Sequence, residues 1–232
     1  SHMALGPGCG DNAGAALGLG LRPGRTSVSL GTSGVVAAVS ATPTHDASGL
    51  VTGFADATGA FVPLACTLNG ARVLDAAKRV LGVTYDEFDA LALSAAPGAG
   101  GLVHVPYLEG ERTPNLPDAT ASLEGMTLAN CDPAHVARAA VEGLLTLMRG
   151  ALDAVRAQGV PIERVVMVGG GARSRAVRSL ASGILGAEVE VPSPAEYVAL
   201  GAAKQAAALN VAGLGACGQT HRCADRAGGS DV

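Results

Sequence analysis

The second half of the chain alternates helix-forming and strand-forming segments, and this alternation restricts the possible folds more than any other feature. Asp132 and Pro133 are a capping residue and a first-turn proline, so they predict the start of a long helix that ends near Gln158. The apolar run RVVMVGGG at 164–171 predicts a buried strand that ends in glycines. A helix at 174–185, a strand at 187–192 and a helix at 194–209 follow. The pattern indicates an α/β fold in which helices flank a mixed sheet.

The first half is richer in strands. Asp11 and Asn12 precede an Ala-rich run and predict the start of a helix. Residues 26–39 predict a strand, a glycine turn and a second strand. The remaining expected elements are strands at 50–57, 60–67 and 102–107, helices at 68–82 and 85–94, and a long loop at 108–121.

The composition suits a globular domain and argues against two classes of partner. Hydrophobic residues make up 48% of the 232-residue chain and charged residues 16%, so a large core can form. The formal net charge is −4 and the basic residues form no run, which argues against nucleic acid. No apolar stretch approaches the roughly 20 residues that span a bilayer, so no membrane partner is expected. The five cysteines are scattered and odd in number, which favours a reducing, cytoplasmic location.

The regular pattern does not cover the two ends of the chain. Ser1, His2 and Met3 are typical of a cleaved expression tag. Residues 4–213 carry the helix and strand signals and are expected to form the domain. Residues 214–232 lack apolar periodicity and predict a flexible tail.

Two segments end a predicted strand in glycines and small hydroxyl residues. The first is Ser29–Gly34, and the second is Val168–Ser174, which opens a helix. Glycine lets the backbone approach a ligand closely, backbone N–H groups can point at phosphate oxygens, and the helix N-terminus adds positive potential. Neither segment has the spacing of a P-loop or of a dinucleotide-binding fingerprint. A nucleotide contact and a purely structural turn therefore both remain open for each segment.

Asp11 has two interpretations. As an N-cap, its carboxylate would accept hydrogen bonds from the first N–H groups of the helix. As a catalytic base, it would accept a hydroxyl proton during phosphoryl transfer, for which a weakly basic carboxylate is sufficient.

Several motifs occur together and resemble one protein family. They are GDNAGA at 10–15, SLGTSG at 29–34, MVGGGARS at 167–174 and ALGAAKQAA at 199–207, and the segment 121–142 is similar to a further signature pattern. Their order and spacing resemble the C-terminal domain of the FGGY carbohydrate kinases, most closely the xylulokinases. The resemblance covers about residues 6–210.

The resemblance implies a ribonuclease H-like fold of the actin, Hsp70 and hexokinase type. It also implies that Asp11 is the proton acceptor and that Asn12 lies beside the sugar. Gly31, Thr32, Ser33 and Gly34 would line the ATP phosphates, and Gly169, Gly170, Gly171, Ala172 and Ser174 would form the adenosine side. Mg²⁺ would be held mainly by the nucleotide phosphates and by a second domain.

Members of this family are about twice as long as this chain. The expected activity is ATP-dependent phosphorylation of D-xylulose to D-xylulose 5-phosphate, with ATP or ADP, a small sugar and the missing N-terminal domain as partners. Because catalysis of this kind depends on positioning, the chain alone is expected to be inactive. The alternatives are a ribulose, gluconate or glycerol kinase, a non-catalytic nucleotide-binding or interaction module, and an inactive truncated product. A homodimer is one candidate assembly.

Overall fold

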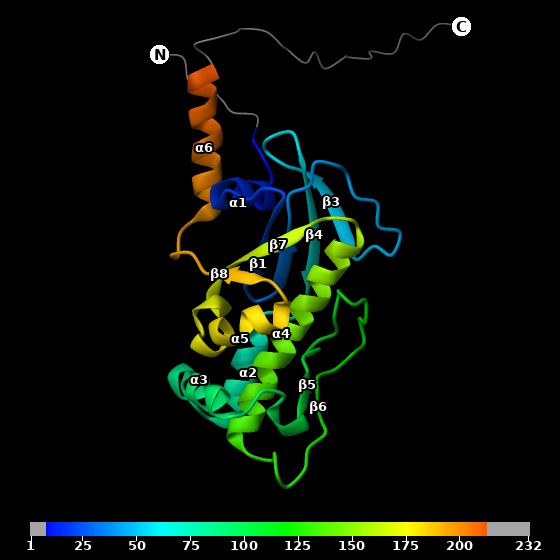
Figure 1. The fold of residues 1–232 in the computed structure, drawn as a ribbon, viewed down its shortest axis with the longest axis vertical. Helices are drawn as coiled ribbons and strands as arrows, with labels where there is room; N and C mark the ends of the chain where they lie inside the picture. Colours follow the sequence, from blue (N-terminus) through cyan, green and yellow to red (C-terminus); the bar gives the residue numbers. More distant parts are fainter. Residues whose placement is uncertain (1–7, 213–232) are drawn as a thin grey trace, which may run out of the picture.

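A computed structural model describes residues 8–212, with side chains to residue 208, and its centre is a six-stranded mixed sheet (Figure 1). The strand order is β3-β4-β2-β1-β7-β8. The strands span β1 Gly24–Leu30, β2 Gly34–Ala37, β3 Val51–Ala55, β4 Phe61–Thr67, β7 Ile162–Val168 and β8 Glu188–Glu190. The first four strands pair antiparallel, whereas β7 and β8 run parallel to β1. This topology is that of the expected ribonuclease H-like fold, with β3 added at one edge.

Helices cover both faces of the sheet. One face packs against α4 (Pro133–Ala157), with α2 (Arg72–Leu81), α3 (Tyr85–Ser94) and α5 (Arg175–Leu185) around it. The other face carries α1 (Asp11–Leu19), which also contacts α6 (Tyr197–Ala212). Figure 1 shows α1 and α6 crossing at one end of the molecule and β5 and β6 at the opposite end.

The alternation of side chains along the strands divides the core between the two faces. In β1, Val28 and Leu30 belong to the large cluster under α4. In β2, Ala37 belongs to a smaller cluster under α1, together with Ala16. Because successive side chains of a strand point to opposite faces, Ser27 and Ser29 of β1 face the α1 side. The α1 side of the sheet therefore carries polar side chains from β1.

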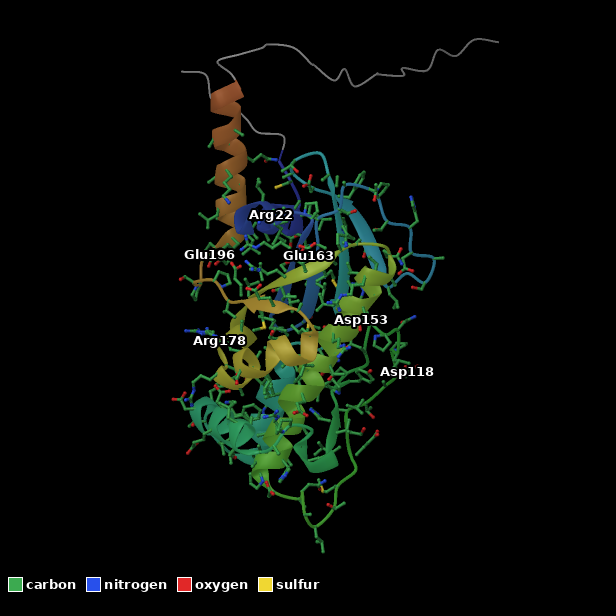
Figure 2. All side chains as sticks on the ribbon, in the orientation of Figure 1. Arg22, Asp118, Asp153, Glu163, Arg178 and Glu196 are labelled. Atoms are coloured by element: carbon green, nitrogen blue, oxygen red, sulfur yellow. The ribbon has the colours of Figure 1, made fainter. Side chains whose placement is uncertain are left out.

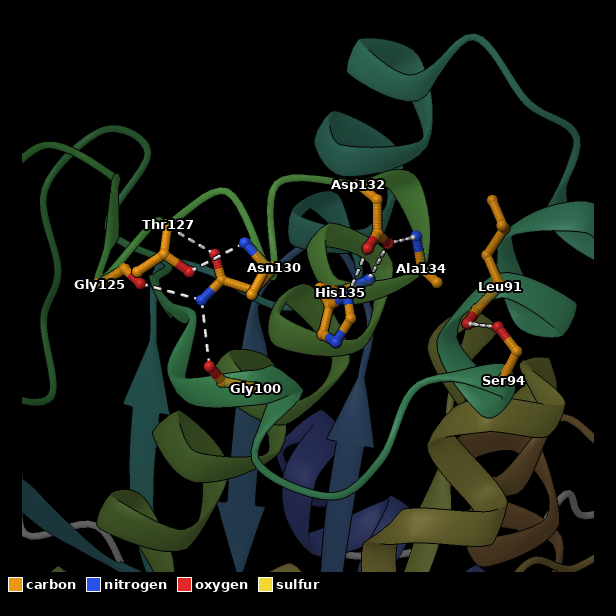
Figure 3. A network of polar contacts seen from close by, with 10 residues as sticks. Leu91, Ser94, Gly100, Gly125, Thr127, Asn130, Asp132, Ala134 and His135 are labelled. Atoms are coloured by element: carbon orange, nitrogen blue, oxygen red, sulfur yellow. Dashed lines mark hydrogen bonds and ion pairs between the residues drawn. The ribbon is translucent and has the colours of Figure 1, made fainter.

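Helix α4 starts at the capping residue that the sequence predicts. Asp132 accepts hydrogen bonds from the backbone N–H groups of Ala134 (2.9 Å) and His135 (3.1 Å), and Pro133 occupies the first turn. The side chain of Asp132 also contacts Nδ1 of His135 at 2.7 Å (Figure 3). This cap satisfies N–H groups that the helix itself cannot pair.

A buried asparagine joins the loops ahead of α4. Asn130 is 1% exposed, and its amide donates to the carbonyls of Gly100 (3.1 Å) and Gly125 (3.0 Å) (Figure 3). The Thr127 N–H donates to Asn130 Oδ1 at 2.7 Å. These bonds support a small second sheet of β5 (Val103–Val105) and β6 (Ser122–Glu124). The sequence predicts the first of these two strands and misses the second, which is only three residues long.

Most predicted elements are confirmed, and two helices have boundaries in error. The helix expected at 194–209 spans Tyr197–Ala212. The helix expected at 68–82 begins at Arg72, because residues 69–71 bond to other loops instead of forming a helical turn. The helix at 85–94 is confirmed, with Thr84 and Glu87 forming a capping box. The expected tag remnant 1–3 and tail 214–232 lie outside the described residues. Within residues 8–212, no helix is both long enough and apolar enough to cross a membrane.

Candidate active site

Two glycine-rich turns lie side by side at one end of the sheet. β1 and β7 are parallel neighbours, with Ser29 opposite Val168, so both strands end at the same place. The turn 31–34 follows β1, and the turn 169–174 follows β7. Gly169 has a φ of +92°, and a Cβ there would lie 2.7 Å from the Leu30 carbonyl oxygen. The structure therefore brings together the two segments that the sequence predicts to contact a nucleotide.

A third segment supports the first turn. The Gly70 N–H donates to the Thr32 carbonyl at 3.0 Å, and the Ala71 N–H donates to the Gly31 carbonyl at 2.7 Å. A Cβ on Gly70 would lie 2.5 Å from the Gly31 carbonyl oxygen, so this approach requires glycine. The sequence analysis missed this contact, although Asn69-Gly70 is a turn signal that argues against a helix there.

A cleft of about 790 Å³ opens between α1, the polar face of the sheet and the turn after β7. Five of the predicted site residues line it: Asp11, Asn12, Gly169, Gly170 and Ala172. Ser27 and Ser29 form part of its floor. Its wall is completed by residues of the connection between β8 and α6 and by the first two residues of α6, namely 191, 192 and 194–198. The cleft therefore places the proposed catalytic residue and the second glycine turn around one space.

The other predicted site residues lie outside this lining. Thr32 and Ser33 are exposed in the first turn, beside Gly31. Gly34 is buried, and its N–H donates to Thr67 Oγ1 at 3.0 Å. Gly171 is a buried member of the second turn. Ser174 caps α5, because its Oγ accepts from the Val177 N–H at 3.1 Å.

The sequence expectation about the start of α5 needs a correction. A short 3₁₀ turn, Gly170–Arg173, separates the glycines from this helix. The first N–H groups of α5, on Arg175 and Ala176, donate to the carboxylate of Asp89 at 2.7 and 3.4 Å. Because these N–H groups are already paired, the backbone that a ligand could contact here is that of the turn 169–174, not that of the helix.

The N-cap interpretation of Asp11 is wrong. Gly10 is the N-cap of α1, and Asp11 is its first helical residue. The side chain makes no capping bond, and Oδ1 accepts only from the adjacent Asn12 N–H, at 2.8 Å, among the residues described. The Asp11 side chain is exposed at the cleft, so its second carboxylate oxygen is open to a ligand.

Two arginines add positive charge to the cleft. Arg173 and Arg178 both line it, and Nε of Arg178 donates to the Ala172 carbonyl at 2.6 Å. Figure 2 shows Arg178 on the same side of the molecule as Glu196, which also lines the cleft. Neither arginine is among the predicted site residues. The signal that could have found them is three arginines within six residues (173, 175 and 178) directly after a glycine turn.

The described residues contain no group of three or more His, Cys, Asp or Glu side chains placed to hold a metal ion. Asp11 and Glu196 are the acidic residues of the cleft lining. Mg²⁺ commonly binds through one or two carboxylates together with substrate phosphates. The cleft fits an ion that arrives with a phosphorylated ligand better than one held by the protein alone.

Comparison with known proteins gives consistent results. The pattern of the FGGY family of carbohydrate kinases, C-terminal domain, matches residues 26–209. Xylulose kinase from Streptomyces rubiginosus is 43% identical over 203 residues, which cover 87% of this chain and 40% of that protein. Gluconokinase from Bacillus licheniformis is 32% identical over 196 residues, covering 78% and 38%. The chain thus spans about 40% of the length of these relatives.

A solved structure confirms the fold. The crystal structure of xylulose kinase from Bifidobacterium adolescentis is similar with a TM-score of 0.85 and 56% sequence identity. The match covers 89% of this chain and 41% of that one. The expected actin- and hexokinase-type fold is confirmed by this likeness and by the strand order.

Proposed function

Because this chain belongs to the FGGY family of carbohydrate kinases, whose C-terminal domain it matches, we propose that it is the nucleotide-binding half of an ATP-dependent sugar kinase. The proposed reaction converts D-xylulose and ATP to D-xylulose 5-phosphate and ADP. One observation carries the proposal: Asp11 and Asn12 line the same cleft as Gly169, Gly170 and Ala172. A proton acceptor and a nucleotide-binding backbone must face one space for phosphoryl transfer to occur there.

In this proposal the nucleotide lies along the two glycine turns. Gly31, Thr32 and Ser33 face the phosphates, and Gly170 and Ala172 contact the adenosine side. Arg173 and Arg178 contribute positive charge that favours an anionic ligand. Mg²⁺, bound through the phosphates, would neutralise the charge that develops on the transferred group.

Asp11 accepts the proton of the sugar hydroxyl as that oxygen attacks the phosphorus atom. Its position fits this role, because the carboxylate is exposed to the cleft and one of its oxygens is oriented by the Asn12 N–H. Asn12 lies next to it and is available to the sugar. The protein to test is a full-length kinase, in which this chain is joined to the part that its relatives have and it lacks. In that kinase, Asp11→Asn should lower kcat by roughly 10²- to 10⁴-fold. Asp11→Asn should leave ADP affinity within about twofold, and a larger loss would argue against this role.

The chain alone should not turn over sugar. Its relatives are more than twice as long. Without the part that this chain lacks, the transferred phosphoryl group would be exposed to water. We expect no D-xylulose-dependent formation of ADP by the pure 232-residue protein in a coupled assay. Measurable turnover would show that the remaining part of the relatives' length is not needed for activity.

The identity of the sugar rests on the relatives. The xylulose kinase of Streptomyces rubiginosus is 43% identical, against 32% for the gluconokinase of Bacillus licheniformis. The proposed substrate can be tested by measuring kcat/KM for D-xylulose and for gluconate in the full-length kinase. A higher value for gluconate would replace D-xylulose in the proposal.

Nucleotide binding can be measured on the chain itself. A Cβ on Gly170 meets no atom within 4 Å, so Gly170→Val places two methyl groups in the cleft without a clash inside the protein. We expect the unmodified chain to bind Mg-ADP in calorimetry with a Kd between roughly 10 µM and 1 mM, and the variant to bind at least about tenfold more weakly. Gly183→Val is the matched control, because Gly183 also meets nothing within 4 Å but lies outside the cleft lining. Equal binding by all three proteins would place the nucleotide elsewhere.

A further inference from the structure

We propose that two buried carboxylates outside the cleft, Glu111 and Asp89, are positioning residues that hold the two glycine turns from behind. Neither lines the cleft. Each carboxylate accepts hydrogen bonds from a segment far away in the sequence, and each such segment contacts or continues one turn. The inference rests on the proposed nucleotide site, which it extends.

Glu111 is 1% exposed and accepts hydrogen bonds only from N–H groups. The Leu68 N–H donates to Oε1 at 2.6 Å, and the backbone N–H and side-chain amide of Asn69 donate to Oε2 at 3.3 and 2.9 Å. The N–H groups of Arg112 (2.7 Å) and Thr113 (3.4 Å) complete the set. Glu111 takes part in none of the salt bridges of the part of the chain that the structure describes. A carboxylate is an acceptor only, so it can serve all these donors at once.

The segment that Glu111 holds is the support of the first turn. Asn69 is fully buried, and it directly precedes Gly70 and Ala71. Those two residues donate to the carbonyls of Thr32 and Gly31, at 3.0 and 2.7 Å. On the other side, Thr67 Oγ1 accepts from the Gly34 N–H and donates to the Asn69 carbonyl. A short chain of hydrogen bonds therefore links Glu111 to both ends of the turn 31–34.

Asp89 does the same for the second turn. It lies on α3 and is 4% exposed. It accepts from Ser174 Oγ at 2.5 Å and from the N–H groups of Arg175 and Ala176. These residues follow the 3₁₀ turn Gly170–Arg173 directly. The position of that turn is therefore fixed to α3, an element that does not reach the cleft.

The alternative is that both carboxylates only stabilise the domain. A neutral amide of nearly the same shape separates these roles, because it replaces one acceptor oxygen with a donor that faces an N–H group. Such a substitution should disturb the bonded segment first. A purely structural carboxylate would lower the stability of the domain without a local effect on the turns.

The experiment compares Glu111→Gln and Asp89→Asn with Asp56→Asn in the 232-residue chain. Asp56 is a matched control: its carboxylate accepts from Thr58 N–H and Ala60 N–H at 2.7 Å, in the β3–β4 turn and outside the cleft lining. Backbone hydrogen exchange reports the two turns without a ligand. Glu111→Gln should raise exchange at 31–34 and 68–71, and Asp89→Asn at 174–177. Both should weaken Mg-ADP about tenfold, whereas Asp56→Asn should not.

The outcomes distinguish this inference from the proposed function. If the unmodified chain does not bind ADP, the proposed function fails while the exchange pattern still tests the positioning roles. Unchanged exchange at 31–34 in Glu111→Gln, or a rise spread equally over β1 and α4, would overturn the inference. So would a local rise in exchange with unchanged ADP affinity. Should Glu111→Gln not fold, Glu111→Asp keeps the charge, and it should show the same local pattern with a smaller rise.

Discussion

The cleft wall that carries the glycine turns is held by side-chain carboxylates, whereas the wall that carries Asp11 is held by helices in backbone contact. Behind the turns, Glu111 and Asp89 are buried and fully bonded. On the other wall, α1 crosses α6 so closely that a Cβ on Gly18 would lie 1.9 Å from the Tyr197 carbonyl oxygen. Lys204 of α6 adds bonds to the last carbonyls of α1, at 3.0 and 2.9 Å.

Each wall can therefore be disturbed separately. Hydrogen bonds to a buried carboxylate fix a loop that has no regular structure of its own. Close backbone packing fixes two helices, and it depends on the absence of side chains at the crossing. The first wall should therefore be sensitive to removal of polar groups, and the second to the addition of atoms.

The largest expected effect tests the helix crossing. Alanine at position 18 raises helix propensity by about 1 kcal/mol over glycine, yet its Cβ would overlap backbone atoms of residue 197. We expect Gly18→Ala to lower the free energy of unfolding by about 1–3 kcal/mol and to raise hydrogen exchange in α1 and α6, with exchange in the turn 31–34 and at 174–177 unchanged. Gly183→Ala is the control, since a Cβ there meets nothing. A stable Gly18→Ala protein would show that the crossing is looser than described.

An intermediate effect tests the charge on the turn wall. Arg178→Ala removes a guanidinium that lines the cleft and should weaken Mg-ADP about three- to tenfold in calorimetry, because charge-assisted contacts to phosphate are lost. Arg149→Ala is a matched control, because Arg149 also donates to a backbone carbonyl, that of Ile184, but lies outside the cleft lining. Equal affinities would remove Arg178 from the site.

The smallest expected effect tests whether the stability of the fold and the affinity for Mg-ADP can change independently. Hydrogen bonds from the His135 backbone and side chain lower the pKa of Asp132 below its ordinary value of 3.8. A lowered pKa means that Asp132 stabilises the fold above its ordinary pKa and that this contribution is lost as pH falls through the lowered value. Asp132→Ala should melt at a lower temperature than the parent at pH 7, and the difference should shrink toward pH 3 or so.

Both walls of the cleft lie away from the Asp132 cap, so Mg-ADP affinity at pH 7 should be the same in Asp132→Ala and in the parent chain. A loss of affinity would mean that global stability, and not the local bonds of either wall, controls binding.

The sequence predicts elements that have local signals. Thr84 with Glu87 marks the start of α3, and Asp132 with Pro133 marks the start of α4. The two glycine turns were also predicted, because each follows an apolar strand. These features depend on neighbours within a few residues, so the chain itself displays them.

The missed features depend on distant residues. Glu111 bonds to Leu68 and Asn69, and Asp89 bonds to Ser174, across spans that no local pattern records. The helix expected from residue 68 starts at Arg72 for the same reason, because Asn69 bonds to Glu111 and residues 70–71 bond to the turn 31–34. The N-cap alternative for Asp11 is wrong because Gly10 fills that position, and a capping residue and a first-turn residue look alike in sequence.

The pairing of β1 with β7 also sets when the site can exist during folding. β1, β2 and β4 come from neighbouring segments of the sequence. β7 is separated from them by α2, α3 and α4. Contacts between such distant segments form slowly, since a long loop must close first. The two glycine turns meet only when β7 has docked beside β1. The nucleotide of the proposed function would therefore stabilise the completed sheet but no intermediate that lacks β7, so its binding would report that β7 has docked.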